Sequence, residues 1–455
     1  MTPVRLPAGI TKDIYKVTSQ TFAALGLSTP VLNALEAAQY RTPTPIQAGT
    51  IPALLSGRDV LGQAQTGTGK TAAFVLPILE RLSKQPPPNG KWRGPRAPRA
   101  LILAPTRELA IQIADSVATY GRNLKLAHTV VMGGVKQQAQ VRALSHGVDI
   151  LIATPGRLLD LVEQRRADLR FIDMVVLDEA DRMLDMGFIR DIRRLMGKLP
   201  TDRQSLLFSA TMPQEIADLA GTFLTDPVRV TIAAKSVAVD AIDQRVHFAP
   251  QADKGRLLTQ MLADPDMRRV VVFTRTKRGA EKVGKILGRA GVSSDTLHGN
   301  KSQNARQRAL DGFRRGTTRV LVATDIAARG IDVDDVSHVI NFELPVEPES
   351  YVHRIGRTAR AGAQGIAVSL CDPAERKTLH AIERLIKRKL AVVGGTDAAP
   401  AEESGPSKTA PRPPRRRTRR RNRPKTVKTA ASGSAPKPRR RRRRSGPRAS
   451  ASRAA

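Results

Sequence analysis

The feature that most constrains the fold is an alternation of short apolar segments with longer stretches of helical spacing. The first half of the chain contains five such segments, at residues 59–64, 100–105, 149–155, 174–181 and 205–211. The second half contains four more, at residues 269–276, 319–325, 338–344 and 365–370. Short apolar segments rich in β-branched residues are typical of strands buried on both faces of a parallel sheet. The alternation therefore predicts an α/β fold with helices flanking mostly parallel sheets.

One stretch without this rhythm, TIAAKSVAVDAID at residues 231–243, separates the two sets of strands. We therefore predict an N-terminal domain over residues 21–230, an interdomain linker over 231–243 and a C-terminal domain over 244–392. The first twenty residues, 1–20, lack the apolar stretch and cleavage site of a secretory signal, and we expect a short flexible extension there. A chain of 455 residues is long enough for two such domains with sizeable cores.

The C-terminal tail, predicted over residues 393–455, is rich in Pro, Ala, Ser and Arg. Residues 397–455 hold 20 Lys or Arg against 3 acids, so they contribute +17 to the net charge of +35. Such a segment buries too little apolar surface to offset the entropy of ordering, and it is predicted to be disordered. The charge indicates a polyanionic partner, with nucleic acid favoured over an acidic membrane surface. The chain has no apolar run long enough to span a bilayer.

Three residue types narrow the setting further. The single cysteine, Cys371, is interpreted as a core residue at the end of a strand, and without a partner thiol the expected location is the reducing cytoplasm. The seven histidines lack metal-ligand spacing, so no zinc site is expected. Aromatic residues make up only 3% of the chain, which predicts contacts with the phosphates and sugars of a nucleic acid rather than base stacking.

A phosphate-binding loop is indicated by AQTGTGKT, residues 64–71, which follows a strand and leads into the helical pattern AAFVLPILERL. A strand, a Gly-containing loop and Lys-Thr at a helix N-terminus surround a phosphate with backbone N–H groups. In this arrangement Lys70 reaches the β and γ phosphates of ATP, and Thr71 is a ligand of Mg²⁺. The loop residues predicted to bind the nucleotide are Gln65, Thr66, Gly67, Thr68 and Gly69. A flexible Gly-Thr turn is the alternative interpretation.

A second strand, Met174 to Leu177, runs directly into the carboxylates of Asp178, Glu179 and Asp181. A buried carboxylate is costly unless a cation meets it, so these acids either form a solvated helix start or receive a metal. Combined with the phosphate loop upstream, the pattern predicts that Asp178 holds Mg²⁺ through water. Glu179 is then predicted to orient and deprotonate the water that attacks the γ phosphate.

The sequence strongly resembles the DEAD-box family of ATP-dependent RNA helicases over residues 22 to about 390. The motifs appear in the order of that family: FAALGL with YRTPTPIQ, AQTGTGKT, PTRELA, GG, TPGR, DEAD, SAT, VVFTRT, SQNARQRAL, ATDIAARGID and HRIGRTARAG. The overall pattern is most similar to the bacterial RhlE-type branch. The resemblance implies two tandem RecA-like domains that close on ATP, Mg²⁺ and RNA together, with local unwinding or remodelling of RNA duplexes and RNA–protein complexes.

The resemblance also implies how the nucleotide is recognised. Tyr40 would stack on adenine and Gln47 would hydrogen-bond its edge, although Gln47 also fits a helix-start residue after TPTP. Asp332 would contact the ribose. Arg357 and Arg360 resemble arginine fingers that reach the γ phosphate from the second domain, whereas a run of arginines is ordinarily a solvated face.

Further roles follow only from the resemblance. Ser209 and Thr211 would couple hydrolysis to strand separation. The implied RNA contacts are Thr106, Arg107, Gly133, Gly134, Thr154 and Arg157 in the first domain and Arg275, Gly299, Thr324 and Asp325 in the second. Thr154 before Pro155 also fits a helix N-cap with proline at the first helical position.

The chain departs from the family pattern at three positions, which puts details of RNA contact and domain closure in doubt. Gln39 and Ala359 stand where Gly is usual, and Asn300 follows HG where Asp is commoner. A DNA helicase on the same fold and an ATP-gated RNA chaperone or clamp with little unwinding remain as alternative functions. Ribosomal or RNA-degradation assemblies are the expected partners besides RNA.

Overall fold

The computed structural model describes residues 21–65, 67–85, 97–232, 242–328, 336–359 and 365–395. The predicted extension, residues 233–241 of the predicted linker, and the tail from residue 396 lie outside these ranges. We call residues 21–232 the first lobe and residues 242–395 the second lobe.

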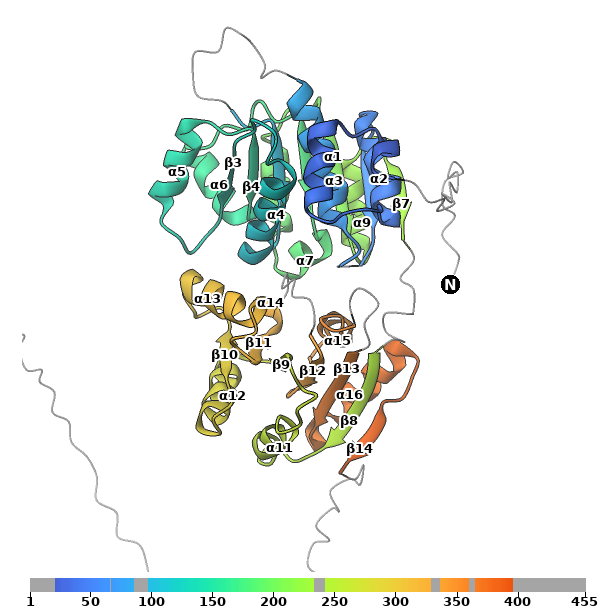
Figure 1. The fold of residues 1–455 in the computed structure, drawn as a ribbon, viewed down its shortest axis with the longest axis vertical. Coiled ribbons are helices and arrows are strands. Elements are labelled where there is room, and N and C mark those ends of the chain that lie inside the picture. Colours follow the sequence, from blue (N-terminus) through green and yellow to red (C-terminus); the bar gives the residue numbers. More distant parts are fainter. Residues whose placement is uncertain are drawn as a thin grey trace, which may run out of the picture. The chain divides into compact units, whose positions relative to one another are not determined.

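The first lobe is built on a sheet of seven strands in the order β3-β4-β2-β5-β6-β1-β7 (Figure 1). All of its strand pairs are parallel. The strands are β1 Val60–Gln63, β2 Ala100–Leu103, β3 His128–Val131, β4 Ile150–Ala153, β5 Met174–Leu177, β6 Gln204–Ser209 and β7 Val228–Thr231. Strands β2, β4, β5 and β6 are buried along their whole length, which explains why their sequences are almost continuously apolar.

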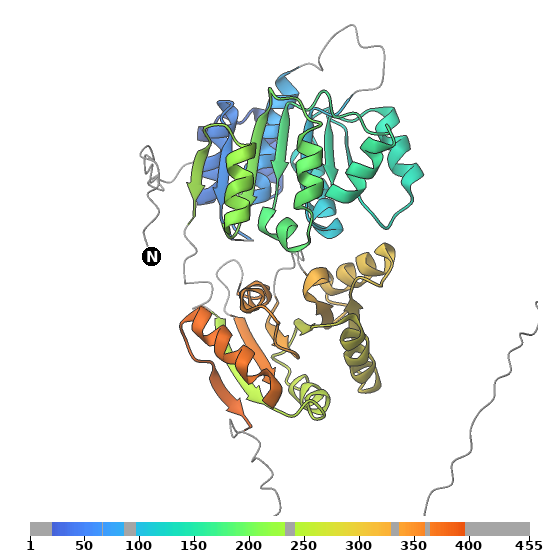
Figure 2. The same cartoon turned by 180° about the vertical axis from the view of Figure 1, so that it is seen from behind.

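Helices cover both faces of this sheet (Figure 1 and Figure 2). The helices α1 to α4 pack on one face and contribute to one apolar core with β1, β2 and β6. The helices α6 to α9 contribute to a second core on the other face. In chain order the elements are a 3-10 turn η1 Ala23–Leu25, α1 Thr29–Ala37, α2 Pro45–Leu55, α3 Lys70–Lys84, α4 Arg107–Tyr120, α5 Gln137–His146, α6 Pro155–Glu163, α7 Ala180–Asp185, α8 Ile189–Met196 and α9 Gln214–Phe223.

The second lobe also has seven parallel strands, in the order β10-β11-β9-β12-β13-β8-β14. The strands are β8 Ile242–Phe248, β9 Val270–Thr274, β10 Ser294–Leu297, β11 Val320–Thr324, β12 His338–Asn341, β13 Gly365–Cys371 and β14 Ala391–Gly394. The helices are α11 Lys254–Met261, α12 Lys277–Arg289, α13 Gln303–Arg314, α14 Asp325–Ala328, α15 Pro348–Ile355 and α16 Arg376–Ile386, with a 3-10 turn η2 at Pro373–Glu375. The tail was predicted from residue 393, whereas β14 continues to Gly394.

The two lobes have the same topology. In each sheet the order, counted along the lobe's own strands, is third, fourth, second, fifth, sixth, first and seventh. Because every strand is parallel, the carboxyl ends of each sheet meet at one edge, where open α/β sheets bind ligands. The predicted α/β fold with two parallel sheets is therefore confirmed. Cys371 is buried at the end of β13, which confirms its predicted core position. Within the described ranges, none of the helices is long and apolar enough to cross a membrane.

Candidate nucleotide and RNA sites

The phosphate loop joins the carboxyl end of β1 to the first residue of α3. Lys70 opens α3, is buried, and its Nζ donates a hydrogen bond to the Ala64 carbonyl at 2.8 Å. Gly69 has φ +91°, and a Cβ at this position would collide with the side-chain amide of Gln47. Only glycine suits such a position. Helix α3 thus begins shortly after the carboxyl end of β1, and its N-terminal amides stay a predicted phosphate site. Thr66 lies outside the described residues.

Asp178 lies at the same edge of the sheet, directly after β5. Its side chain is 2% exposed, and in the part of the chain that the structure describes its Oδ1 has no hydrogen-bond partner. Burial raises the pKa of Asp178 to about 7, and the charge of Lys70 opposes this rise. A buried carboxylate oxygen without a partner is a rare and costly feature. Its position fits a cation that arrives with the nucleotide.

Glu179 begins α7 in a strained backbone conformation, with φ 56°. Its carboxylate is buried and forms an ion pair with Arg182. Burial favours a raised pKa, but the charges of Arg182, Lys70 and Arg357 together hold the pKa of Glu179 below its usual value. Left-handed backbone at a residue other than glycine is typical of functional sites. The strain and the surrounding cations keep an ionised carboxylate beside the phosphate loop.

Asp181 connects this strand end to the predicted coupling residues. Its Oδ2 accepts hydrogen bonds from the backbone N–H of Ala210 at 3.1 Å and of Thr211 at 2.8 Å, and from the Thr211 hydroxyl at 3.0 Å. Ser209 accepts from the Asp181 N–H at 3.3 Å and donates to the Thr211 carbonyl at 2.6 Å. The structure therefore brings Ser209 and Thr211 onto the acidic strand end. Sequence reasoning assigned no role to Asp181 or Arg182, although both follow Glu179 within one helical turn.

The predicted adenine contacts differ in their surroundings. Gln47 is 1% exposed, and its amide is engaged twice: Oε1 accepts from the Thr44 N–H at 2.8 Å, and Nε2 donates to the Gly69 carbonyl at 3.1 Å. Gln47 thus closes the start of α2 and links it to the phosphate loop. Tyr40 is 42% exposed and makes an edge-to-face contact with Tyr120 at 5.6 Å between ring centroids. The exposed ring is available for stacking.

The predicted RNA contacts of the first lobe gather near the carboxyl ends of β2, β3 and β4. The Thr106 hydroxyl caps α4 by accepting from the Leu109 N–H at 3.2 Å. A Cβ on Gly134, which has φ +79°, would collide with the guanidinium of Arg107. Gly133 precedes it, and the Arg157 guanidinium lies 3.5 Å from the Val135 carbonyl. Thr154 and Pro155 take the predicted N-cap and first positions of α6.

In the second lobe the predicted RNA contacts have protein partners that the sequence did not reveal. Asp325 receives two hydrogen bonds from the buried Arg354, at 2.5 and 2.7 Å. The Arg275 guanidinium pairs with Glu375, and the backbone N–H of Arg275 donates to Glu343 Oε2 at 2.7 Å. Thr324 ends β11 and is buried, whereas a Cβ on Gly299 would meet open space. Arg354 and Glu375 are functional candidates found only in the structure.

Two groups of contacts join residues of the first lobe to residues of the second. Glu108 accepts from Arg306 at 2.9 Å and from Gln303 at 3.0 Å, and all three side chains are buried. Arg182 lines the same small pocket as Arg354 and Arg357. Glu108, Gln303 and Arg306 lie within motifs of the family pattern, but the sequence predicted no role for them. The predicted ligands Arg360 and Asp332 lie outside the described residues.

These features agree with comparisons to known proteins. Residues 44–219 match the family model of the DEAD/DEAH box helicases, and residues 253–362 match that of the helicase conserved C-terminal domain. The chain is 44% identical to the RNA helicase CrhR of Synechocystis sp. over 82% of this chain and 74% of the relative. It is also 44% identical to the ATP-dependent RNA helicase RhlB of Pseudomonas syringae pv. tomato, over 81% of this chain and 93% of the relative.

Solved structures give the same answer. The structure of S. cerevisiae Dbp5 bound to RNA and ADP BeF3 aligns with a TM-score of 0.73 and 33% identity, over 82% of this chain and 95% of that one. Mss116p bound to ssRNA and AMP-PNP aligns with a TM-score of 0.74 and 29% identity, over 84% of this chain and 81% of that one. The chain belongs to the DEAD/DEAH box helicase family, and its two lobes have the tandem RecA-like fold.

Proposed function

We propose that this chain is an ATP-dependent RNA helicase that couples ATP binding and hydrolysis to local unwinding or remodelling of RNA duplexes and RNA–protein complexes. One observation carries the proposal. The buried carboxylate of Asp178, whose Oδ1 has no hydrogen-bond partner among the described residues, lies beside Lys70 and an ionised Glu179, at the sheet edge that carries the phosphate loop. This is the charge arrangement that phosphoryl transfer from ATP needs.

The residues divide the work of hydrolysis between them. Lys70 and the amides of residues 65–71 hold the phosphates, and Thr71 with Asp178 would hold Mg²⁺, whose charge offsets that of the phosphates. Glu179 orients and deprotonates the attacking water. Arg357 and Arg360 act as fingers on the γ phosphate, and the effect of Arg357 on the pKa of Glu179 supports its closeness to the reacting groups. Tyr40 and Gln47 recognise adenine, and Asp332 contacts the ribose.

The proposed RNA contacts would hold phosphates and sugars rather than bases, because the chain has few aromatic residues. Thr106, Arg107, Gly133, Gly134, Thr154 and Arg157 serve the first lobe, and Arg275, Gly299, Thr324 and Asp325 serve the second. Ser209 and Thr211 connect hydrolysis to strand separation through Asp181. The hydrogen bonds between Glu108 and Arg306 are consistent with lobes that close on each other.

Several finer assignments belong to the same proposal. Residues 21–230 form the ATP-binding domain, 244–392 the C-terminal helicase domain, and 393–455 a basic tail that adds nonspecific RNA binding. The motif pattern supports the bacterial RhlE-type branch, although the relatives CrhR and RhlB have other names. The cytoplasm is the proposed location, and ribosomal or RNA-degradation assemblies are proposed partners.

The test compares two substitutions in RNA-stimulated ATP hydrolysis. Glu179→Gln should lower turnover by roughly 10²- to 10⁴-fold, because it removes the base, while ATP and RNA binding persist. Lys70→Ala should weaken ATP binding itself. Glu215→Gln, at an exposed position of α9, is the control and should leave both properties unchanged. Hydrolysis by Glu179→Gln within twofold of the parent would refute the assignment.

The same assay separates the alternative functions. A clamp with little unwinding would release phosphate slowly even with saturating RNA. A DNA helicase would be stimulated by DNA at least as strongly as by RNA of the same sequence and length.

A further inference from the structure

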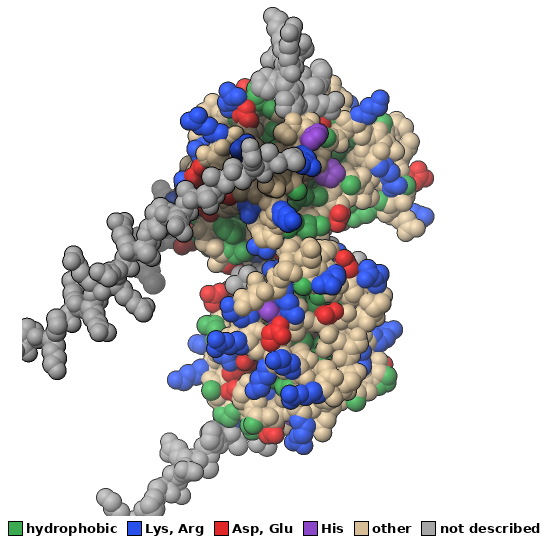
Figure 3. All heavy atoms as spheres, turned by 90° about the vertical axis from the view of Figure 1, so that its left-hand side faces the viewer, with side chains coloured by type: hydrophobic (Ala, Val, Ile, Leu, Met, Phe, Trp, Pro, Cys, Tyr) green, Lys and Arg blue, Asp and Glu red, His purple; other side chains and the backbone are tan. Residues whose placement is uncertain are grey.

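Helix α12 of the second lobe has a strongly basic exposed face. Arg278, Lys282, Lys285 and Arg289 follow one another at intervals of four, three and four residues, which places them on one side of the helix. All four are exposed. They span three turns, or about 16 Å along the helix axis. Figure 3 shows Lys and Arg side chains gathered over the face of the second lobe to which α12 belongs, with acidic side chains among them.

A solvated helix face is the ordinary explanation for such a row, and three observations argue against it. First, within the described residues none of these four side chains forms an ion pair with an acid. A solvated helix is usually stabilised by pairs of opposite charge at these spacings, and here like charges repel instead.

Second, cations occupy the wrong end of the helix for stability. Lys277 and Arg278 are the first two residues of α12, where the helix dipole is positive and disfavours further positive charge. The Thr276 hydroxyl caps this end by accepting from the Gly279 N–H at 3.0 Å. The Thr276 cap satisfies one amide, and the two cations beside it destabilise the isolated helix start and attract an anion.

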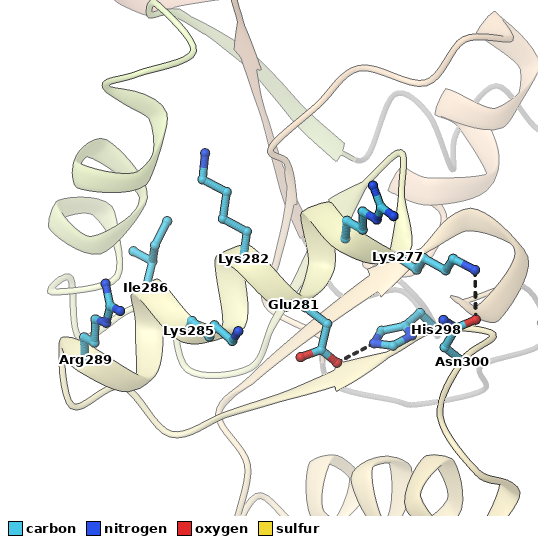
Figure 4. Close-up of a pocket in the computed structure, with 9 residues that line it drawn as sticks. Lys277, Glu281, Lys282, Lys285, Ile286, Arg289, His298 and Asn300 are labelled. Atoms are coloured by element: carbon cyan, nitrogen blue, oxygen red, sulfur yellow. Dashed lines mark hydrogen bonds and ion pairs between the residues drawn. The ribbon is translucent and has the colours of Figure 1, made fainter.

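Third, the basic face lines a groove, which we call the α12 groove and define by α12 and the loop after β10 (Figure 4). Its volume is about 630 Å³. His298 lines it at 3% exposure, with Nε2 2.6 Å from Glu281 Oε1. The His298 Nδ1 is buried and has no hydrogen-bond partner in the described structure. The basic side chains of α12 therefore line a hollow rather than a flat solvated face.

The groove is continuous with the predicted RNA contacts. Lys277 donates to Asn300 Oδ1 at 3.0 Å, and Asn300 directly follows Gly299. Arg275 lies two residues before Lys277 at the end of β9. A polyanion that leaves the contacts at Gly299 and Arg275 therefore meets the first turn of α12. None of the residues that line the groove is Phe, Tyr or Trp, and the His298 ring is buried, so its contacts are to phosphates rather than to stacked bases.

We propose that the α12 groove is an accessory RNA-binding surface that holds the phosphate backbone of RNA beyond the strand bound at Arg275 and Gly299. The inference rests on the proposed RNA helicase function and extends it. The groove binds without regard to sequence and anchors the flanking RNA on the second lobe. An acidic protein segment is the competing occupant, and it is less favoured because the groove opens from the predicted RNA contacts.

The experiment uses the full chain with Lys282, Lys285 and Arg289 all changed to alanine, since these are the groove residues farthest along α12 from Gly299. Binding is measured with two labelled RNAs, a short single strand that fills only the predicted contacts and the same strand extended by a duplex. The variant should bind the extended RNA at least fivefold more weakly than the parent does. The slope of log affinity against log salt concentration should become shallower by about 0.7 to 0.9 for each phosphate that the variant no longer neutralises.

Controls separate this result from a general loss of charge or function. Exposed cations on or after α16, Lys377, Arg384 and Lys389, provide a matched triple alanine variant that should bind both RNAs like the parent. Changing Lys282 and Lys285 to arginine should preserve binding of the extended RNA. Short-strand affinity and ATP turnover at saturating short RNA should remain unchanged in the groove variant, which keeps the proposed helicase function testable by itself.

Two outcomes would overturn the inference. Equal affinity of parent and groove variant for the extended RNA would exclude an RNA-binding role of the groove. If the groove variant bound an acidic peptide more weakly than the parent but bound the extended RNA equally well, the surface would be assigned to a protein partner instead.

Discussion

The two lobes have the same strand order, but the lysine at the equivalent position has different partners in each lobe. Lys70 and Lys254 are each the first residue of the helix that follows the lobe's first strand. Lys70 has one carbonyl partner and lies near Asp178 and Glu179. Lys254 is fully buried and donates to the carbonyls of Phe342 and Leu370, and it pairs with Glu375 at 2.5 Å. One lysine faces a ligand site, whereas the other is satisfied by the protein.

The loop before each lysine explains the difference. Residues 64–69 include two glycines with positive φ, Gly67 and Gly69, and a Cβ on Gly67 would meet nothing within 4 Å. Residues 249–253, APQAD, contain no glycine. The repeated topology thus provides a possible phosphate site twice, and the loop sequence decides which lobe uses it. At the same edge of the second lobe, Arg275 and Asp325 follow β9 and β11 and pair with Glu375 and Arg354.

The largest effect is expected for Lys254→Met, which breaks the ion pair of the second lobe. Removal of one partner from a buried pair costs about 3 to 5 kcal/mol, because the other charge stays buried. Thermal unfolding should show a destabilised second lobe, while ATP with Mg²⁺ still stabilises the first lobe. Lys70→Met should lose this stabilisation by ATP, and Lys377→Met, at an exposed site, should unfold like the parent. Unchanged stability of Lys254→Met would contradict the comparison.

A smaller effect of opposite sign is expected for Asp178→Asn. The desolvated carboxylate, whose Oδ1 has no partner among the described residues, destabilises the protein without nucleotide, so its neutralisation should raise the free energy of unfolding by about 1 to 3 kcal/mol. ATP turnover should be lost in the same variant. Glu375→Gln in the second lobe should instead lower the free energy of unfolding, since Glu375 accepts from four donors: the Lys254 and Arg275 side chains and the Leu344 and Asp372 backbone N–H groups. Chemical denaturation without nucleotide checks both signs, and equal signs would refute the contrast.

The smallest effect on stability is expected at Gln39 in the first lobe and Ala359 in the second. Gln39 and Ala359 have φ 62° and 55°, which explains why glycine is the usual residue at these two positions of the family pattern. Gln39→Gly and Ala359→Gly should each stabilise the protein by about 0.5 to 1 kcal/mol, because relief of the strain exceeds the added chain entropy. Ala217→Gly, in the exposed part of α9, should destabilise by about 1 kcal/mol. Denaturant titration measures all three, and loss of stability in both glycine variants would show that the strain is absent.

Local sequence patterns were sufficient for much of this molecule. The strands around Met174 and Val320 and the loop before Lys70 could be predicted because burial on both faces and glycine spacing act over only a few residues. The position of Asp178 at a strand end also followed directly from its neighbours. The same patterns predicted a linker at residues 231–243 but not its conformation, because residues 233–241 show neither the strand nor the helix periodicity.

The charged partners of the site residues could be found only in the tertiary structure. Arg354 is 29 residues from Asp325, Arg275 is 100 residues from Glu375, and Arg306 is 198 residues from Glu108. No local periodicity connects residues at such separations. The first two pairs lie within the second lobe, where the strand order brings them together, whereas the third joins the two lobes. Each pair contains at least one buried side chain, and loss of its partner would leave that charge uncompensated. The sequence by itself indicated which groups would perform the chemistry, and the packing of two similar sheets decided which of them are satisfied by protein partners.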